Sequence, residues 1–140
     1  MVNKMKVLGI ALLLALVSAS PAMLGQQVGE SCEKNPTFTI QYFDVTPWPI
    51  MGTQQYTVTM NGVFTSKEYV KQLYIGTKDG KGFWHYTYQT IEKEYLKGAS
   101  GNFTVSLQGP SVKGAYTDQL SLHRSDFNTI NCWQYAYDIK

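Results

Sequence analysis

The 140-residue chain has very little arginine and no clustered charge of either sign. Arg124 is its only arginine, and no run of lysines accompanies it. The chain has 12 basic and 10 acidic residues, and leaving out Lys4 and Lys6 makes the two numbers equal. Nucleic-acid binding depends on neutralising phosphates, so this composition argues against a nucleic-acid partner. It also argues against a polybasic membrane anchor.

Signals of catalysis and metal binding are equally scarce. The chain has two histidines, His85 and His123, and no metal-ligand spacing, phosphate-binding loop or dinucleotide fingerprint. Ser121 and Asp126 lie close to His123 in the sequence, but no nucleophile elbow or oxyanion-hole signal accompanies them. We therefore expect a protein that is not an enzyme and uses no cofactor or metal.

The amino-terminal segment has the features of a secretory signal peptide. Lys4 and Lys6 precede an apolar run over 7–17, and small residues follow it. The run is shorter than the roughly 20 residues that cross a bilayer, and a short buried helix is the alternative interpretation. We expect a signal peptide over 1–19, with cleavage somewhere between 19 and 25.

The remainder, residues 26–140, has the length of one domain and contains no second long apolar run. We expect a monomer that is secreted or lies in the lumen of an endosome- or lysosome-like compartment. The two cysteines, Cys32 and Cys132, would then meet oxidising conditions, which favour a disulfide over free thiols or an intermolecular pair. Closing a loop of about 100 residues stabilises a fold by roughly 4–5 kcal/mol in the chain-entropy model.

Apolar and polar residues alternate with period two along the body of the chain, and glycine and proline interrupt the pattern. This alternation is typical of half-buried strands. Residues 91–97 have some helical character, over a segment too short to alter the fold class. We therefore predict an all-β sandwich of about seven strands. The predicted strands span residues 37–45, 55–64, 69–77, 83–91, 102–107, 115–122 and 130–139.

Several segments resemble those of the ML family, the MD-2-related lipid-recognition proteins. Val45–Pro49, followed by Gly52 and the strand that contains Gly62, resembles the opening of ML domains. The segment 101–107 (GNFTVSL) resembles a later strand of the family, and 110–116 resembles the turn into the penultimate strand.

The end of the chain carries the resemblance further. Cys132 followed by Trp133, paired with Cys32, is similar to the terminal disulfide of the family's Niemann-Pick type C2 branch. The phosphatidylglycerol/phosphatidylinositol transfer proteins are a second branch that the chain resembles. Many members have two further disulfides, for which this chain lacks the cysteines.

The resemblance implies an immunoglobulin-like sandwich whose sheets part to hold a lipid or sterol, in a protein that binds and transfers lipid. Such a site needs an apolar volume between the sheets, lined by inward-facing side chains. The alternative interpretation is that these side chains simply form the core. By alternation we predict the lining residues Val58, Met60, Leu73, Ile75, Trp84, Tyr86, Phe103, Val105, Leu107, Tyr116, Leu120, Trp133 and Tyr135.

Two exposed features are also expected. Trp48, between two prolines, either contacts a membrane transiently during lipid transfer or plugs one end of the sandwich. Asn102, Phe103 and Thr104 form an N-glycosylation sequon beside a turn.

Two other functions remain open at the level of sequence. Ten tyrosines and three tryptophans are enough for a carbohydrate-binding module, which would present aromatic rings on one flat face. A secreted protein-interaction domain without a small ligand would have a fully packed core instead.

Overall fold

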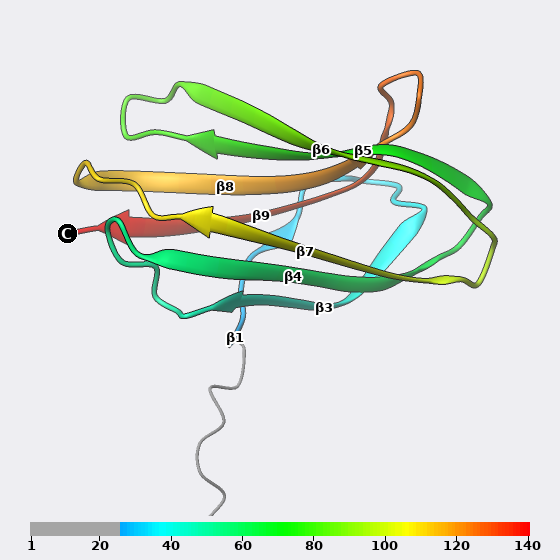
Figure 1. Cartoon of the computed structure of the whole chain (residues 1–140), viewed down its shortest axis with the longest axis horizontal. Coiled ribbons are helices and arrows are strands. Elements are labelled where there is room, and N and C mark those ends of the chain that lie inside the picture. Colours follow the sequence, from blue (N-terminus) through cyan, green and yellow to red (C-terminus); the bar gives the residue numbers. More distant parts are fainter. Residues whose placement is uncertain (1–25) are drawn as a thin grey trace, which may run out of the picture.

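The computed structural model describes residues 26–140, which form two antiparallel β-sheets packed face to face (Figure 1). One sheet has the strand order β1-β3-β4-β7 and the other β2-β9-β8-β5-β6. The predicted signal peptide lies outside the described residues. The strands are β1 (Gln26–Gln27), β2 (Glu30–Ser31), β3 (Phe38–Thr46), β4 (Gln55–Phe64), β5 (Glu68–Lys78), β6 (Trp84–Tyr95), β7 (Ser100–Gln108), β8 (Gly114–His123) and β9 (Thr129–Ile139).

The predicted all-β sandwich is confirmed, and its seven predicted strands correspond to β3 through β9. The two-residue strands β1 and β2 were not predicted. No helix that could cross a membrane occurs between residues 26 and 140.

The helical character of residues 91–97 is overridden, because β6 continues as a strand to Tyr95. The start of β5 pairs with this segment, so that Glu68 opposes Tyr95. A bulge accommodates one extra residue of β6 opposite Lys71, and Glu92 there adopts a φ of 48°. Hydrogen bonding along a long hairpin thus outweighs a weak local preference.

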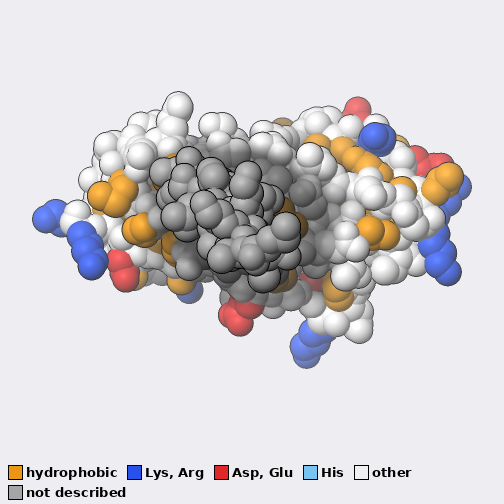
Figure 2. Space-filling model, turned by 90° about the horizontal axis from the view of Figure 1, so that it is seen from below, with side chains coloured by type: hydrophobic (Ala, Val, Ile, Leu, Met, Phe, Trp, Pro, Cys, Tyr) orange, Lys and Arg blue, Asp and Glu red, His pale blue; other side chains and the backbone are white. Residues whose placement is uncertain are grey.

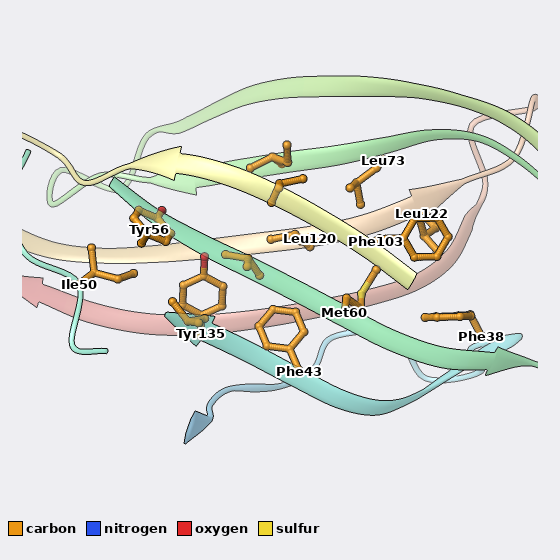
Figure 3. Packing of buried hydrophobic residues seen from close by; sticks show 14 of the residues in the cluster. Phe38, Phe43, Ile50, Tyr56, Met60, Leu73, Phe103, Leu120, Leu122 and Tyr135 are labelled. Atoms are coloured by element: carbon orange, nitrogen blue, oxygen red, sulfur yellow. The ribbon is translucent and has the colours of Figure 1, made fainter. Parts of the chain in front are cut away.

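Strand β4 illustrates how the alternation places the core. Its residues Tyr56, Val58 and Met60 are buried, whereas the residues between them are half-buried and lie on the outer face. Val58 opposes Val105 of β7, and Met60 opposes Phe103. Apolar side chains from both sheets meet in this way along the whole sandwich (Figure 3).

One end of the sandwich is held by an aromatic stack between the sheets and by an ion pair of the larger sheet whose carboxylate also bonds to Thr37 beside the smaller sheet. The turn from β6 to β7 carries the chain from one sheet to the other, and beside it the rings of Phe64 and Tyr95 stack with centroids 4.3 Å apart. Arg124 donates two hydrogen bonds to Glu68, of 2.7 and 2.6 Å. Thr37, which precedes β3, donates a further bond of 2.7 Å to the same carboxylate. The Arg124 guanidinium lowers the pKa of Glu68.

The predicted disulfide between Cys32 and Cys132 is present, and it joins residues 100 positions apart. The Cys32 backbone N–H also donates a 3.0 Å hydrogen bond to the Cys132 carbonyl. Cys132 opposes Ser121 of β8, whose neighbours Leu120 and Leu122 point into the core, so the disulfide lies on the outer face of its sheet. It fixes β2 against β9.

Replacing both cysteines, Cys32→Ser with Cys132→Ser, is expected to lower the free energy of unfolding by roughly 3–5 kcal/mol, because the unfolded chain regains the freedom of a long loop. Urea denaturation of the oxidised protein measures this loss. Reductant should destabilise the wild-type protein to a similar extent and leave the double variant unchanged. Equal stability of the oxidised protein and the variant would contradict the prediction.

Candidate functional site

The structure places most of the predicted lining residues between the two sheets. Nine of them are buried: Val58, Met60, Leu73, Ile75, Phe103, Val105, Tyr116, Leu120 and Tyr135. Leu107 and Trp133 are half-buried and pack against this core. The interior is therefore apolar over most of its length.

Trp84 and Tyr86 instead lie on the outer face of their sheet, so their predicted inward orientation is wrong. Tyr86 opposes Gly76 of β5, whereas Thr87 opposes the buried Ile75. Directly opposed residues share a face of a sheet, so Thr87 points inward and Tyr86 outward. Tyr86 is 56% exposed. Strand β6 is an edge strand, and its most apolar side is the side that faces solvent.

At the edge of the sandwich formed by β6 and β7, inward-facing side chains are exposed to solvent. These strands are the last members of their respective sheets. The inward residues of β6, among them His85, Thr87 and Gln89, are exposed although they face the same side as the core. Figure 1 shows the β5–β6 hairpin diverging from β7 with increasing distance from their common turn.

The opposite edge, where the two-residue strands β1 and β2 border β3 and β9, is closed. The rings of Phe43 and Trp133 stack across it with centroids 5.4 Å apart. The Trp133 indole N–H donates a 2.8 Å hydrogen bond to the carbonyl of Val28, which holds the amino-terminal segment over this edge. Of the two edges, β6/β7 is thus the one at which inward-facing side chains are exposed to solvent.

A buried aspartate, Asp118, joins the two sheets at the other end of the interior. It is fully buried, and its carboxylate accepts hydrogen bonds from the hydroxyls of Tyr56, Tyr135 and Tyr137 at 2.6, 3.0 and 3.2 Å. Tyr56 comes from β4 and the other three residues from the opposite sheet. Figure 3 shows the Tyr56 and Tyr135 rings lying toward each other at this end. We call these four residues the aspartate–tyrosine cluster.

Burial governs the protonation of this cluster. It raises the pKa of Asp118, and the hydrogen bonds from the tyrosines oppose this rise only partly. Burial and the nearby carboxylate raise the pKa of Tyr56, Tyr135 and Tyr137, so all three remain hydroxyl donors at physiological pH. We did not predict the cluster from the sequence. The sequence feature that could have indicated it is Asp118 itself, a charged residue at an inward position between Tyr116 and Leu120.

The outer face of the larger sheet carries a groove of about 470 Å³ beside the disulfide. Its walls include Tyr74, Tyr86, Gln119, Ser121 and His123. His123 Nδ1 lies 3.0 Å from the Phe127 carbonyl, which can only accept, so Nδ1 carries the proton. Nε2 then accepts the Ser121 hydroxyl at 2.8 Å.

The sequence neighbour Asp126 does not contact this histidine. Its carboxylate instead accepts hydrogen bonds from the backbone and side chain of Asn128, at 3.0 and 2.8 Å. Ser121, His123 and Asp126 are therefore not assembled as a triad. Within residues 26–140, no group of three or more acidic, histidine or cysteine side chains is placed to hold a metal ion.

Trp48 and Asn102 lie at the ends and on the surface of the sandwich. Trp48 is half-buried, and its ring meets that of Tyr135 edge-on with centroids 6.2 Å apart. This packing favours the plug over the exposed membrane contact. Asn102 is exposed on the outer face of β7, and its glycosylation stays a prediction.

Comparison with known proteins identifies the fold. No protein-family model and no curated sequence matches the chain. Among solved structures, a Niemann-Pick type C2 protein from the Japanese carpenter ant superposes with a TM-score of 0.62 at 10% identity, covering 81% of this chain and 99% of that one. Chicken MD-1 complexed with lipid IVa gives 0.53 at 16% identity, covering 78% and 86%. The C-terminal domain of wzt gives 0.59 at 15% identity, covering 83% and 80%.

The chain has the immunoglobulin-like sandwich fold of these proteins. At such low identities the similarity shows the fold alone. The ant protein and MD-1 have the fold that the resemblance to the ML family implied.

The raised pKa of Asp118 predicts an unusual dependence of stability on pH. Between the ordinary value of 3.8 and its raised value, the folded protein binds a proton that the unfolded chain does not. Lowering the pH through this window should therefore stabilise the wild-type protein relative to Asp118→Asn, which cannot titrate. The effect of Glu68, whose pKa is lowered, is common to both proteins and cancels.

The measurement is the free energy of unfolding of both proteins between about pH 7 and pH 4, a range that begins above the usual pKa of a carboxyl group. The difference, wild type minus variant, should increase as the pH falls. A constant or decreasing difference would show that Asp118 does not keep its proton in the folded state.

Proposed function

We propose that this protein binds a lipid chain or sterol between its two sheets and admits it at the β6/β7 edge. The observation that carries this proposal is an apolar interior, closed at the β3/β9 edge, whose other edge leaves the inward side chains of β6 exposed to solvent. It would act as a carrier and not as an enzyme. The disulfide fits a secreted or lumenal location.

The middle of the interior offers the chemistry that a lipid chain needs. Between the aspartate–tyrosine cluster and the Phe64–Tyr95 stack, its walls are mainly aliphatic, with Val58 and Val105 on one sheet facing Leu73, Ile75 and Leu120 on the other. An apolar pocket of this kind binds by excluding water from the ligand and from its own walls.

Binding requires the sheets to move apart, because these side chains now contact one another. An empty apolar cavity costs on the order of 24 cal/mol per Å³, so the interior is expected to close when no ligand fills it. Met60 is flexible and polarizable, which suits a wall that must repack. Strand β6 is hydrogen-bonded only to β5, so it can swing outward more easily than an inner strand.

The similar structures support this proposal. One of them, chicken MD-1, holds lipid IVa, and the carpenter ant protein is a Niemann-Pick type C2 protein. With the sequence motifs at residues 45–62 and 101–116, they favour membership of the ML family.

Native mass spectrometry of the mature protein from a eukaryotic host, followed by solvent extraction, tests the function. We expect one lipid per protein, or uptake of one from mixed sterol and phospholipid vesicles. A ligand-free mass, with no uptake from either vesicle lipid, would overturn the proposal.

Blocking the β6/β7 edge should strongly reduce uptake. Leu107 is half-buried and faces the interior from β7, so Leu107→Trp should fill the opening and reduce lipid uptake by about tenfold or more, because an overpacked site excludes ligand. The readout is the fraction of lipid-loaded protein after incubation with vesicles.

The matched control is Ser106→Trp. Ser106 is the exposed neighbour on the outer face of the same strand, so the same ring there should leave uptake unchanged. Thermal unfolding would establish that both variants fold. Normal uptake by a folded Leu107→Trp would exclude the β6/β7 edge as the route.

A further inference from the structure

Four aromatic side chains, two exposed and two half-buried, form a shelf on the outer face of β5 and β6, away from the proposed lipid site. The shelf consists of Tyr74, Trp84, Tyr86 and Tyr88. Trp84 and Tyr86 are stacked with centroids 5.7 Å apart and planes 15° apart, and Tyr74 lies 6.0 Å from Tyr88. Tyr86 and Tyr88 are 56% and 61% exposed. Exposed aromatic rings grouped on one face mark a binding surface.

A glycine lets the rings lie across the strand. A Cβ atom at Gly76 would come within 2.7 Å of the Tyr86 ring and 3.2 Å of the Trp84 ring. The edges of the two stacked rings therefore lie over the Gly76 backbone, in space that any larger side chain would occupy.

Polar side chains of the groove adjoin the shelf. Gln119 and Ser121 lie on β8, directly opposite Gly76 and Tyr74. Ser121 is 7% exposed and lines the groove, with its hydroxyl 2.8 Å from His123 Nε2. The Gln119 amide makes only a 3.5 Å contact with the Cys32 sulfur, which is weak enough to be exchanged for a ligand.

The surface is electrically neutral where the rings and the groove meet. Its central side chains are tyrosine, glutamine, serine and a histidine whose two ring nitrogens are engaged with neutral partners. Charged groups occur at the margins, with Glu33 at one wall of the groove and the Lys78 ammonium 5.8 Å from the Trp84 ring. A nucleic acid or an anionic headgroup would find little compensating charge there.

We propose that this outer face binds a neutral oligosaccharide. The apolar face of a sugar ring carries slightly positive C–H groups, which suit the negative face of an aromatic ring. Its hydroxyls would bond to Gln119 and Ser121. Four rings along two strands offer stacking positions for more than one sugar unit. This site lies on the opposite face of the sheet from the proposed lipid site and does not depend on it.

An array of neutral, sialylated and sulfated oligosaccharides, followed by calorimetry with the strongest neutral binder, tests this site. We expect neutral oligosaccharides to bind with little dependence on salt. Tyr86→Ala should weaken binding by about tenfold or more, since it removes a stacking ring. Tyr86→Phe, which keeps the ring, should retain most of the affinity.

Tyr42→Ala is the matched control. Tyr42 is 40% exposed on the outer face of the other sheet, so its removal should not change glycan binding. Gly76→Val should displace the rings and weaken binding as Tyr86→Ala does. Thermal unfolding and lipid uptake of each variant separate loss of this site from loss of the fold or of the proposed lipid function.

Three outcomes would overturn the proposal. One is that no oligosaccharide binds, or that only charged ones do. A second is that Tyr86→Ala abolishes binding to vesicles of phosphatidylcholine with phosphatidylglycerol, which would make the shelf a membrane contact. A third is that Tyr86→Ala converts a dimer into a monomer, which would assign the shelf to a second copy of the chain.

Discussion

The hydrogen bonds that tie Tyr56 to Asp118 across the sandwich constrain the rest of the structure. They lie at one end of the interior, and at the other end the Glu68 carboxylate, paired with Arg124, accepts a hydrogen bond from Thr37 at the start of β3. A buried carboxylate must keep its donors, so the sheets cannot separate there without a large cost. Elsewhere the sheets meet mainly through apolar side chains, which have no directional requirement, with one further polar contact from the Asn131 amide to Met60 Sδ at 3.3 Å. Any opening of the sandwich is therefore confined to its middle and to the β6/β7 edge.

The strands could be predicted because alternation is a local property of the sequence. In β4, the alternating residues Tyr56, Val58 and Met60 predict both the strand and the face that it buries. In β6, alternation groups Trp84, Tyr86 and Tyr88 correctly, but it cannot say which side of the strand meets the core. That choice depends on the register with β5, which sets Tyr86 opposite Gly76. It is a long-range property that no local pattern contains.

The aspartate–tyrosine cluster could not be predicted for a related reason. A charged residue at an inward position usually argues against a strand, and its hydrogen-bond donors lie up to 62 positions away in the sequence. The disulfide, in contrast, followed from the cysteine count and the expected compartment.

The two faces of the larger sheet differ in chemistry. Its inner face is apolar, and its outer face combines aromatic rings with neutral polar groups. Neighbouring residues such as Leu120 and Ser121 therefore lie on opposite faces of the sheet.

The bulge in β6 has a consequence for self-association. An open edge strand of this length presents unpaired backbone groups to which a strand of another molecule could add. At Glu92, however, the left-handed backbone interrupts the regular ladder. The flanking sequence Glu92-Lys93-Glu94 places exposed charges along the same stretch, and charged side chains on an edge strand discourage strand addition. The edge at which we propose that lipid enters is thus also the edge that resists growth into an intermolecular sheet.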